Sequence, residues 1–553
     1  MYFFLPKRHF IEASKLKGHT NILFSERGTF MSQEQYLKKK MGFWSLTTLS
    51  LGGIIGSSWL FGPWVAAKLA GPAAILSWII GAFVITLIAL VYAELGRVKP
   101  ETGGLARYPL YSHGKMLATV TSYSIWFGYC ATAPVESSGV IQYANQFWPG
   151  LYDVTKEQLT TSGILAAMVL MVFFVVFNYF GVKLFAVTNN IITTVKFIVP
   201  VLTIIAFFMT GFHTENFSSQ GFAPNGYSAG LSAILTTGIF FAYTGFGNVI
   251  MMSGEVVNPR RNIPLALITS LGVAAVLYVL LQITFIGAVP TEMLANGWSG
   301  IKFDSPFANL AMMANMVWLS WIITADAMVS PTGSALTYTA GTSRHVFGMA
   351  KSGFLPSYFG TINKKFGVPT RALALNFLVG LLFLFPLKSW TAIVAIVGAI
   401  GIFKYASACV TVMVFRRVGL TKNNGLPGMQ VIAPMAFVFA TLLIYWTNWS
   451  KVQLAITGLV IGIACYLVIY FIQKHQSVEF LGGIYIIFYI LMLVFMSFLG
   501  NFGGKGIIPD PYMSVIVAIF GLAFYYFAVY NGVWYMRKRG NIEELQKSIS
   551  EIS

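Results

Sequence analysis

The chain has 553 residues, of which 56% are hydrophobic and 10% charged, and its mean hydropathy is +0.72. A soluble core of this length needs far less apolar side chain, so the composition excludes an ordinary soluble protein and predicts helices that face lipid or other helices. The formal net charge of +18 does not indicate nucleic-acid binding, because the basic residues follow the pattern of a membrane protein.

Fourteen apolar stretches each approach the roughly 20 residues that a membrane-spanning helix needs. They cover residues 43–66, 73–96, 117–146, 161–180, 185–210, 231–253, 264–288, 314–343, 371–387, 391–415, 428–446, 452–473, 478–499 and 511–536. The connections between them are mostly short, which leaves no soluble domain to hold an active site. We therefore expect an all-α integral membrane protein with about 14 transmembrane helices, and not an enzyme.

The basic residues gather on one side of this predicted topology. With a cytoplasmic N-terminus, 28 of the 36 lysines and arginines lie in cytoplasmic segments, 6 lie outside, and Lys196 and Lys404 lie within helices. This asymmetry predicts a cell-membrane protein with both termini in the cytoplasm. Residues 1–42 form the predicted N-terminal tail, which lacks the apolar core of a cleaved leader, and residues 537–553 form the C-terminal tail.

Clusters of small residues interrupt the first and the sixth span. The first contains Gly52, Gly53 and Gly56, and the sixth contains Gly238 and then Gly245. A glycine within a helix lowers helix stability by about 1 kcal/mol relative to alanine, so these clusters mark places where the span is not required to be a regular helix. Their spacing fits two inverted repeats of five helices, at 43–210 and 231–415, whose broken helices expose backbone groups to a substrate. Close helix packing through a GxxxG pair is the alternative.

Four motifs resemble the amino acid–polyamine–organocation (APC) permeases, in the right order and spacing. They are Gly56-Ser57-Ser58 before Phe61-Gly62-Pro63, Tyr92-Ala93-Glu94-Leu95-Gly96, the stretch Gly254 to Pro264, and the stretch Ser343 to Pro356. The resemblance covers about residues 43–470 and implies a 5+5 leucine-transporter-like core. Four C-terminal helices follow, at 428–473 and, beyond the usual twelve, at 478–536. On the third helix, Pro134-Val135-Glu136 with Gln142-Tyr143 resembles the bacterial aspartate–proton symporter group.

The resemblance implies a substrate site at the two breaks. Free N–H groups at the second half of the first span favour a carboxylate, by hydrogen bonding and by the helix dipole. Carbonyls of the sixth span accept from the substrate ammonium, and two aromatic rings either close over the substrate or pack ordinarily. The predicted substrate-binding residues are Gly56, Ser57, Ser58, Trp59, Phe241, Ala242, Tyr243, Thr244, Gly245 and Lys404.

The sequence departs from the family's pattern at two positions. Ser58 replaces a glycine in the first break and narrows the site. Gly247 replaces an acidic residue that often follows the sixth-helix glycine, which makes exchange of cationic substrates of the arginine–agmatine type less attractive.

Placing a charged side chain at the centre of a bilayer costs about 2.5–3.5 kcal/mol even on the scales that give the lowest values. Each such residue is therefore expected to have a binding partner or a function. Several family members carry a lysine at the position of Lys196, on the fifth helix. Its ammonium is expected to bind carbonyls freed by the first break and a hydroxyl of Ser330 or Ser334, in the place that sodium takes in sodium-coupled relatives. Lys196 either cycles a proton or is a permanent structural cation.

The remaining charged groups divide into proton carriers and gate residues. Glu136 is a candidate proton carrier, or else the ion-pair partner of Lys404. Lys404 alternatively meets the side-chain carboxylate of an acidic substrate, and Asp326 is a third candidate for proton transfer. Contacts of a cytoplasmic gate are expected from Glu94, Glu255 and Arg344. The sequence contains no cluster of residues with metal-ligand spacing, and we expect neither a metal nor a cofactor.

These observations predict a secondary transporter that imports an amino acid, with a proton, by alternating access around the first and sixth helices. Aspartate and glutamate are the candidate substrates. An amino acid or amine exchanger is the closest alternative. An integral membrane enzyme is a remote alternative, because the sequence places no group of catalytic residue types near one membrane–water interface.

Overall fold

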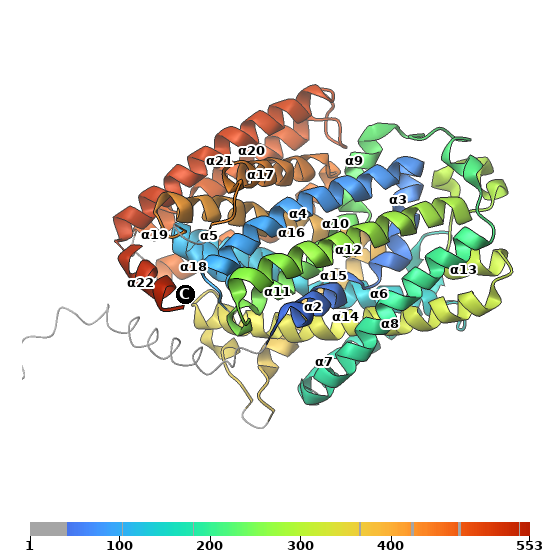
Figure 1. Cartoon of the computed structure of the whole chain (residues 1–553), viewed down its shortest axis with the longest axis horizontal. Helices are drawn as coiled ribbons and strands as arrows, with labels where there is room; N and C mark the ends of the chain where they lie inside the picture. Colours follow the sequence, from blue (N-terminus) through green and yellow to red (C-terminus); the bar gives the residue numbers. More distant parts are fainter. Residues whose placement is uncertain are drawn as a thin grey trace, which may run out of the picture.

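The computed structural model describes residues 41–101, 103–180, 182–363, 366–421, 425–473, 477–540 and 542–552. The predicted N-terminal tail therefore falls outside the described residues, except for its last two. The described chain is almost entirely helical, and its long helices run back and forth through one elongated bundle (Figure 1).

The long helices make up most of the described chain. In order they are α4 (Ala74–Val98), α5 (Gly104–Cys130), α6 (Thr132–Ala144), α7 (Thr161–Phe180), α8 (Val182–Met209), α12 (Pro259–Ala288), α14 (Val317–Lys351), α15 (Thr370–Leu387), α16 (Trp390–Arg417), α17 (Met429–Trp446), α18 (Trp449–Gln473), α20 (Tyr485–Leu499) and α21 (Tyr512–Arg539). Among the described residues, ten helices are long and apolar enough to cross a membrane, or eleven when one bent pair counts as a span. The division into fourteen spans and two five-helix repeats stays a prediction.

Short elements connect the long ones. The helical ones are η1 (Gly71–Ala73), η2 (Thr214–Phe217), η4 (Ser253–Glu255), η5 (Thr291–Asn296), η6 (Trp298–Gly300), α13 (Pro306–Met313), η7 (Ser357–Phe359), α19 (Ser477–Leu481) and α22 (Ile542–Ile552). A small antiparallel hairpin of β1 (Tyr152–Asp153) and β2 (Gln158–Leu159) follows α6, with Tyr152 opposite Leu159.

The first span is broken where its glycines are. Helix α2 (Phe43–Ile54) ends before Ile55-Gly56-Ser57, and α3 (Ser58–Ala70) continues the span. At Gly53 the backbone approaches the sixth span so closely that a methyl group built on Gly245 lies 2.3 Å from the Gly53 carbonyl carbon. Any side chain at Gly245 would push the two segments apart, which explains why glycines occupy both sides of this contact.

The sixth span is divided into α9 (Gly226–Thr236), α10 (Ile239–Tyr243), η3 (Thr244–Phe246) and α11 (Gly247–Met251). The bend of 47° lies between α9 and α10, where Gly238 has a φ of +90°. The sequence indicates interruptions at Gly238 and at Gly245. Gly238 takes the left-handed conformation at the bend, and the short 3-10 helix η3 separates the α-helices α10 and α11 at Thr244–Phe246.

Helix α5 begins 13 residues before the predicted start at 117. Its first part, up to Gly114 with a φ of +80°, is kinked relative to the rest. His113 and His345 are buried in α5 and α14. Both histidines bind backbone carbonyls, of Ala528 and Ser122 respectively, so hydrogen bonding accounts for their burial.

Helix α16 forms the centre of the bundle. The most apolar window of this helix is buried throughout, and α16 packs against α4, α5, α17, α18 and α21. The outer helices α7, α8, α15 and α18 instead expose much of their apolar surface, with Leu382 of α15 at 73% exposure. An apolar surface of this extent fits a lipid environment.

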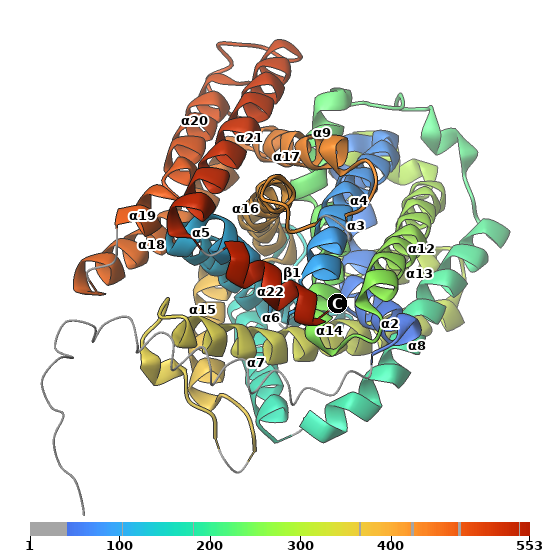
Figure 2. The same cartoon turned by 60° about the vertical axis from the view of Figure 1, so that its left-hand side comes forward.

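The two ends of the bundle differ in charge. At one end, here called the basic end, α4, α16 and α21 finish with Arg97, with Arg416 and Arg417, and with Arg537 to Arg539. At the other, the hairpin end, Lys68 forms an ion pair with Glu157 and Asn145 donates to Asp304. Helices α2, α4 and α22 all meet the basic end (Figure 2).

Candidate functional site

At the break of the first span, a carboxylate from another helix binds the free backbone. Ser57 N donates to Glu136 Oε2 at 3.0 Å, and Glu136, on α6, is only 1% exposed. A methyl group on Gly56 would lie 2.6 Å from Glu136 Oε1, so this position must be glycine for the carboxylate to reach the backbone. The sequence predicts a substrate carboxylate on these N–H groups, and in this structure Glu136 binds one of them.

The carbonyls released by the same break are bound as well. Lys196 Nζ on α8 donates to Gly52 O at 3.1 Å and to Ser334 Oγ at 2.8 Å. The hydroxyl of Tyr278 donates to Ile54 O at 2.9 Å. Since a helix end buried without partners is costly, these contacts explain how the break persists inside the membrane region.

Ser330 does not bind Lys196. Its hydroxyl donates to Asp326 Oδ1 at 2.8 Å, one turn away on α14, and Trp59 Nε1 donates to Asp326 Oδ2 at 3.1 Å. Asp326 is 2% exposed and faces the start of α3. Ser330 and Ser334 therefore serve different charged groups, and α14 presents Asp326, Ser330 and Ser334 at intervals of four residues, on one helix face.

Trp390, which the sequence analysis did not single out, connects the two breaks. Its Nε1 donates to Ser57 Oγ at 2.7 Å, and a methyl group on Gly238 would lie 2.6 Å from its ring. The residue is 1% exposed at the start of α16. A tryptophan that begins a helix gives no sequence signal of such contacts, because they depend on how α16 packs.

A pocket lies between the third, sixth, eighth and tenth spans of the predicted topology. Three of the predicted substrate-binding residues, Phe241, Thr244 and Lys404, line it. The complete lining consists of Gly128, Tyr129, Thr132, Phe241, Thr244, Tyr338, Val397, Gly398, Gly401 and Lys404. Through Thr244 and Gly245 the pocket adjoins the break of the first span, since Gly245 touches Gly53.

The remaining predicted residues of the sixth span do not line this pocket. Tyr243 packs against Trp78 and Tyr278 and donates to Trp78 O at 3.4 Å, which is the ordinary packing that the sequence leaves open as the alternative to a gate. The Phe241 carbonyl, predicted to be free, accepts from Thr244 N and from Thr244 Oγ1 at 2.8 Å. Ala242 is buried at 1% exposure.

Lys404 is a buried cation on the pocket wall. Its Nζ lies 4.8 Å from the centre of the Tyr129 ring and 4.7 Å from that of Tyr405, and the residue is 3% exposed. Among the described residues no carboxylate lies within 4.0 Å of this ammonium, and Glu136 binds Ser57 instead. The predicted Glu136–Lys404 pair is therefore absent from the described contacts. The two aromatic rings offset only part of the free energy that it costs to bury the charge of Lys404.

The three predicted gate residues contribute unequally at the basic end. Glu94 is fully buried and accepts from Arg416 at 2.6 and 2.7 Å and from Leu426 N at 2.8 Å. Glu255 contributes its backbone, since Met41 N donates to Glu255 O at 3.1 Å. Arg344 is exposed on α14 and, within the described part of the chain, forms an ion pair with neither glutamate.

Known proteins are similar to this chain over most of its length. A family model described as amino acid permease matches residues 41–472. The glutamate/serine transporter AimA of Bacillus subtilis is 42% identical over 511 residues, which cover 90% of this chain and 94% of that protein. The aspartate-proton symporter of the same species is 38% identical over 517 residues, covering 91% and 98%. The branched-chain amino acid permease BcaP of Bacillus subtilis is 28% identical over 464 residues, which cover 81% of this chain and 96% of that protein.

Proposed function

The chain belongs to the amino acid permease family and is an amino acid transporter of the membrane, and we propose that it imports an acidic amino acid together with a proton. Lys404 carries this proposal. An ammonium on the wall of a pocket, buried and without a carboxylate partner among the described residues, is a site for an anionic group of a ligand. The names of the two similar relatives, with glutamate and aspartate, support the same substrate class.

The transport cycle follows from the first break. The substrate's main-chain carboxylate and Glu136 are both acceptors for the N–H groups at Ser57, where Glu136 binds in this structure. A protonated Glu136 is a weaker acceptor than the ionised group, so proton binding frees this N–H for the substrate. Substrate and proton thereby bind together, and this is the physical basis of symport.

Lys196 and Asp326 are two further charged residues next to the first break. Lys196 binds the carbonyl side of the same break, and Asp326 binds Trp59 at the start of α3. We assign proton transfer to Glu136, Lys196 and Asp326, with Ser330 and Ser334 between them on α14. The fourteen-span, 5+5 topology with a cytoplasmic basic end belongs to the same proposal, and it rests on the charge asymmetry and the two broken spans.

The test is uptake of labelled L-aspartate into proteoliposomes, with and without an inward proton gradient. Each unlabelled amino acid is added in excess in turn. Gradient-driven uptake blocked mainly by aspartate and glutamate supports the proposal. Uptake that depends on a preloaded amino acid and ignores the gradient would make the protein an exchanger, and uptake blocked mainly by neutral amino acids would remove the role of Lys404.

A further inference from the structure

The C-terminal helix α22 is amphipathic and lies on the basic end. Gly540, with a φ of +71°, ends α21 and lets the chain turn, and α22 then crosses the end of the bundle (Figures 1 and 2). Leu545 and Ile549, one turn apart, are each only 7% exposed and join the main hydrophobic core, while Glu544 and Lys547 are exposed. One face of α22 is therefore packed on the transmembrane bundle.

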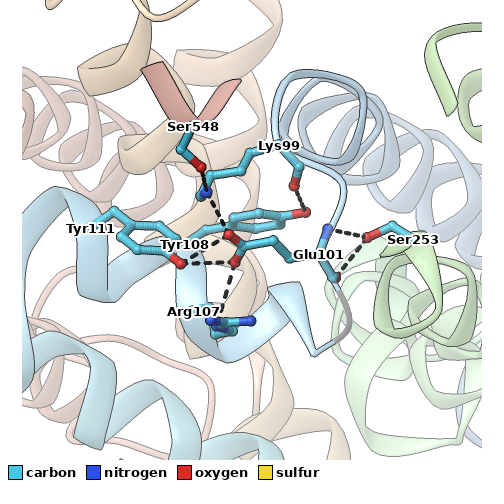
Figure 3. A network of polar contacts seen from close by, with 7 residues as sticks. All are labelled: Lys99, Glu101, Arg107, Tyr108, Tyr111, Ser253 and Ser548. Atoms are coloured by element: carbon cyan, nitrogen blue, oxygen red, sulfur yellow. Dashed lines mark hydrogen bonds and ion pairs between the residues drawn. The ribbon is translucent and has the colours of Figure 1, made fainter. Parts of the chain in front are cut away.

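A polar contact fixes α22 next to the loop between α4 and α5. Lys99 Nζ donates to Ser548 Oγ at 3.1 Å and forms an ion pair with Glu101 Oε1 at 2.6 Å (Figure 3). The side chains of Lys99 and Glu101 are 5% and 6% exposed. Such burial is unusual for an ion pair in a loop, and α22 contributes a hydrogen bond to it.

Glu101 is also the point at which three segments meet. Its backbone N donates to Ser253 Oγ at 3.1 Å, and Ser253 Oγ donates to Glu101 O at 2.8 Å (Figure 3). Ser253 follows the sixth span. Two residues further, Met41 N donates to Glu255 O, which connects the start of the first span to the same place.

The Glu101 carboxylate is held charged by its neighbours. Burial alone raises the pKa of Glu101, but the charges of Arg107 and Lys99, with hydrogen bonds from Lys99 and Tyr111, hold it below its ordinary value. Arg107 Nε lies 3.4 Å from one carboxylate oxygen, and the Tyr111 hydroxyl lies within 3.0 Å of both. The pair that α22 covers is thus a firm ionic contact.

We propose that α22 is a brake on the transporter, which stabilises the state in which the basic end is closed. The two broken spans of the pathway end at the contact of Met41, Ser253 and Glu255, and α22 binds the loop that holds this contact. Opening the basic end separates these segments, so it must break the contacts between Glu101 and Ser253, and α22 supports Glu101 through Lys99. Release of α22 therefore favours opening. The alternating-access cycle of the proposed function gives this brake its consequence for transport, but docking of α22 is testable without any substrate.

The experiment measures access to the pocket from the basic end. A cysteine replaces Thr244, which lines the pocket, in a chain whose Cys130, Cys409 and Cys465 are changed to alanine. Inside-out vesicles receive a membrane-impermeant thiol reagent. We expect Ile549→Asp, and deletion of residues 541–553, to raise the labelling rate at least about tenfold, which corresponds to about 1.4 kcal/mol of lost gate-closing free energy.

Single substitutions on α22 test whether its hydrogen bond to Lys99, and not only its apolar packing, keeps the basic end closed. Ser548→Ala is expected to raise the labelling rate about threefold, or roughly 0.7 kcal/mol, through the lost hydrogen bond, and Ser548→Thr keeps the hydroxyl and is expected to restore the rate. Lys547→Ala, on the exposed face of α22, is the matched control and is expected to change nothing.

Hydrogen exchange of residues 542–552 in the full chain reports docking independently. If Ile549→Asp releases α22, or the deletion removes it, and labelling of the Thr244→Cys chain stays unchanged in either variant, the brake is overturned. Because no amino acid is added, this outcome is distinct from a failure of acidic amino acid uptake, which would overturn only the proposed function.

Discussion

Two regions of the molecule use the same three residue types in different ways. At the first break, Lys196 binds Gly52 and Ser334, while Glu136 binds Ser57 on the other side of the break. At the basic end, Lys99 and Glu101 bind each other directly, and Ser548 shares the ammonium. Backbone separates the charges in the first region, so a proton or a substrate can replace either contact. The direct pair in the second region is suited to holding segments together.

The largest effect is expected from the lysine of the first region. Lys196→Met leaves the Gly52 carbonyl and the Ser334 hydroxyl without their donor, and each buried unsatisfied group costs about 1–3 kcal/mol. We expect gradient-driven L-aspartate uptake to fall about 100-fold or more, measured as the initial rate in proteoliposomes. Lys156→Met, whose side chain is 69% exposed at the hairpin end, is the control. Full uptake by Lys196→Met would mean that this region tolerates the loss of its cation.

The second effect concerns Lys404, for which the described part of the chain shows no carboxylate within 4.0 Å. Lys404→Met removes the positive charge from the pocket wall, so we expect uptake of L-aspartate and L-glutamate to fall about 10- to 30-fold, or roughly 1.4–2 kcal/mol. The measurement is uptake of labelled L-aspartate and L-glutamate by the same preparation. Unchanged uptake of both would make Lys404 a structural cation.

The sequence predicts most of the helical framework, because its signals are local. Residues 161–180 are predicted as a span and form α7 within the same bounds, since the stretch is apolar and its flanks are polar. The start of α5 is missed because Gly104 to Lys115 mixes polar, charged and apolar residues and contains the kink at Gly114. The interruptions of the sixth span at Gly238 and Gly245 are predicted too, but the local signals are equal and only packing, against Trp390 and Gly53 respectively, shows what each glycine accommodates.

The site is less predictable than the framework, because its contacts join distant parts of the chain. The resemblance to APC permeases leads to Lys196 and to the first break. Ser57 and Glu136 are 79 residues apart, and neither residue alone indicates that the carboxylate binds this N–H. Likewise, the ring of Tyr129 reaches Lys404 only because α5 packs on α16.

A third, smaller effect tests the separated charges directly. Glu136→Gln keeps the shape of the side chain but removes its charge, so the substrate carboxylate no longer competes with an anion at Ser57. We expect the gradient-driven part of uptake to disappear, a decrease of about fivefold or roughly 1 kcal/mol, while counterflow of labelled against unlabelled L-aspartate continues. Counterflow and net uptake are measured on one preparation. A gradient response that survives the substitution would assign the proton to Lys196 or Asp326.

The smallest effect is expected at the basic end, where pH should change almost nothing. A carboxylate whose pKa lies below its ordinary value contributes stability that is present above that ordinary value and is lost only as pH falls through the lowered one. Glu101 therefore stays charged between pH 8 and about 5.5, and the mobility of a spin label on Lys547→Cys should stay constant over this range. Glu101→Gln should raise the mobility at every pH, because Lys99 then loses its ionic partner. A mobility that rises steadily from pH 8 to 5.5 in the unmodified network would mean that the pair at the basic end titrates like an exposed one, and the contrast between a firm contact there and exchangeable contacts at the first break would no longer hold.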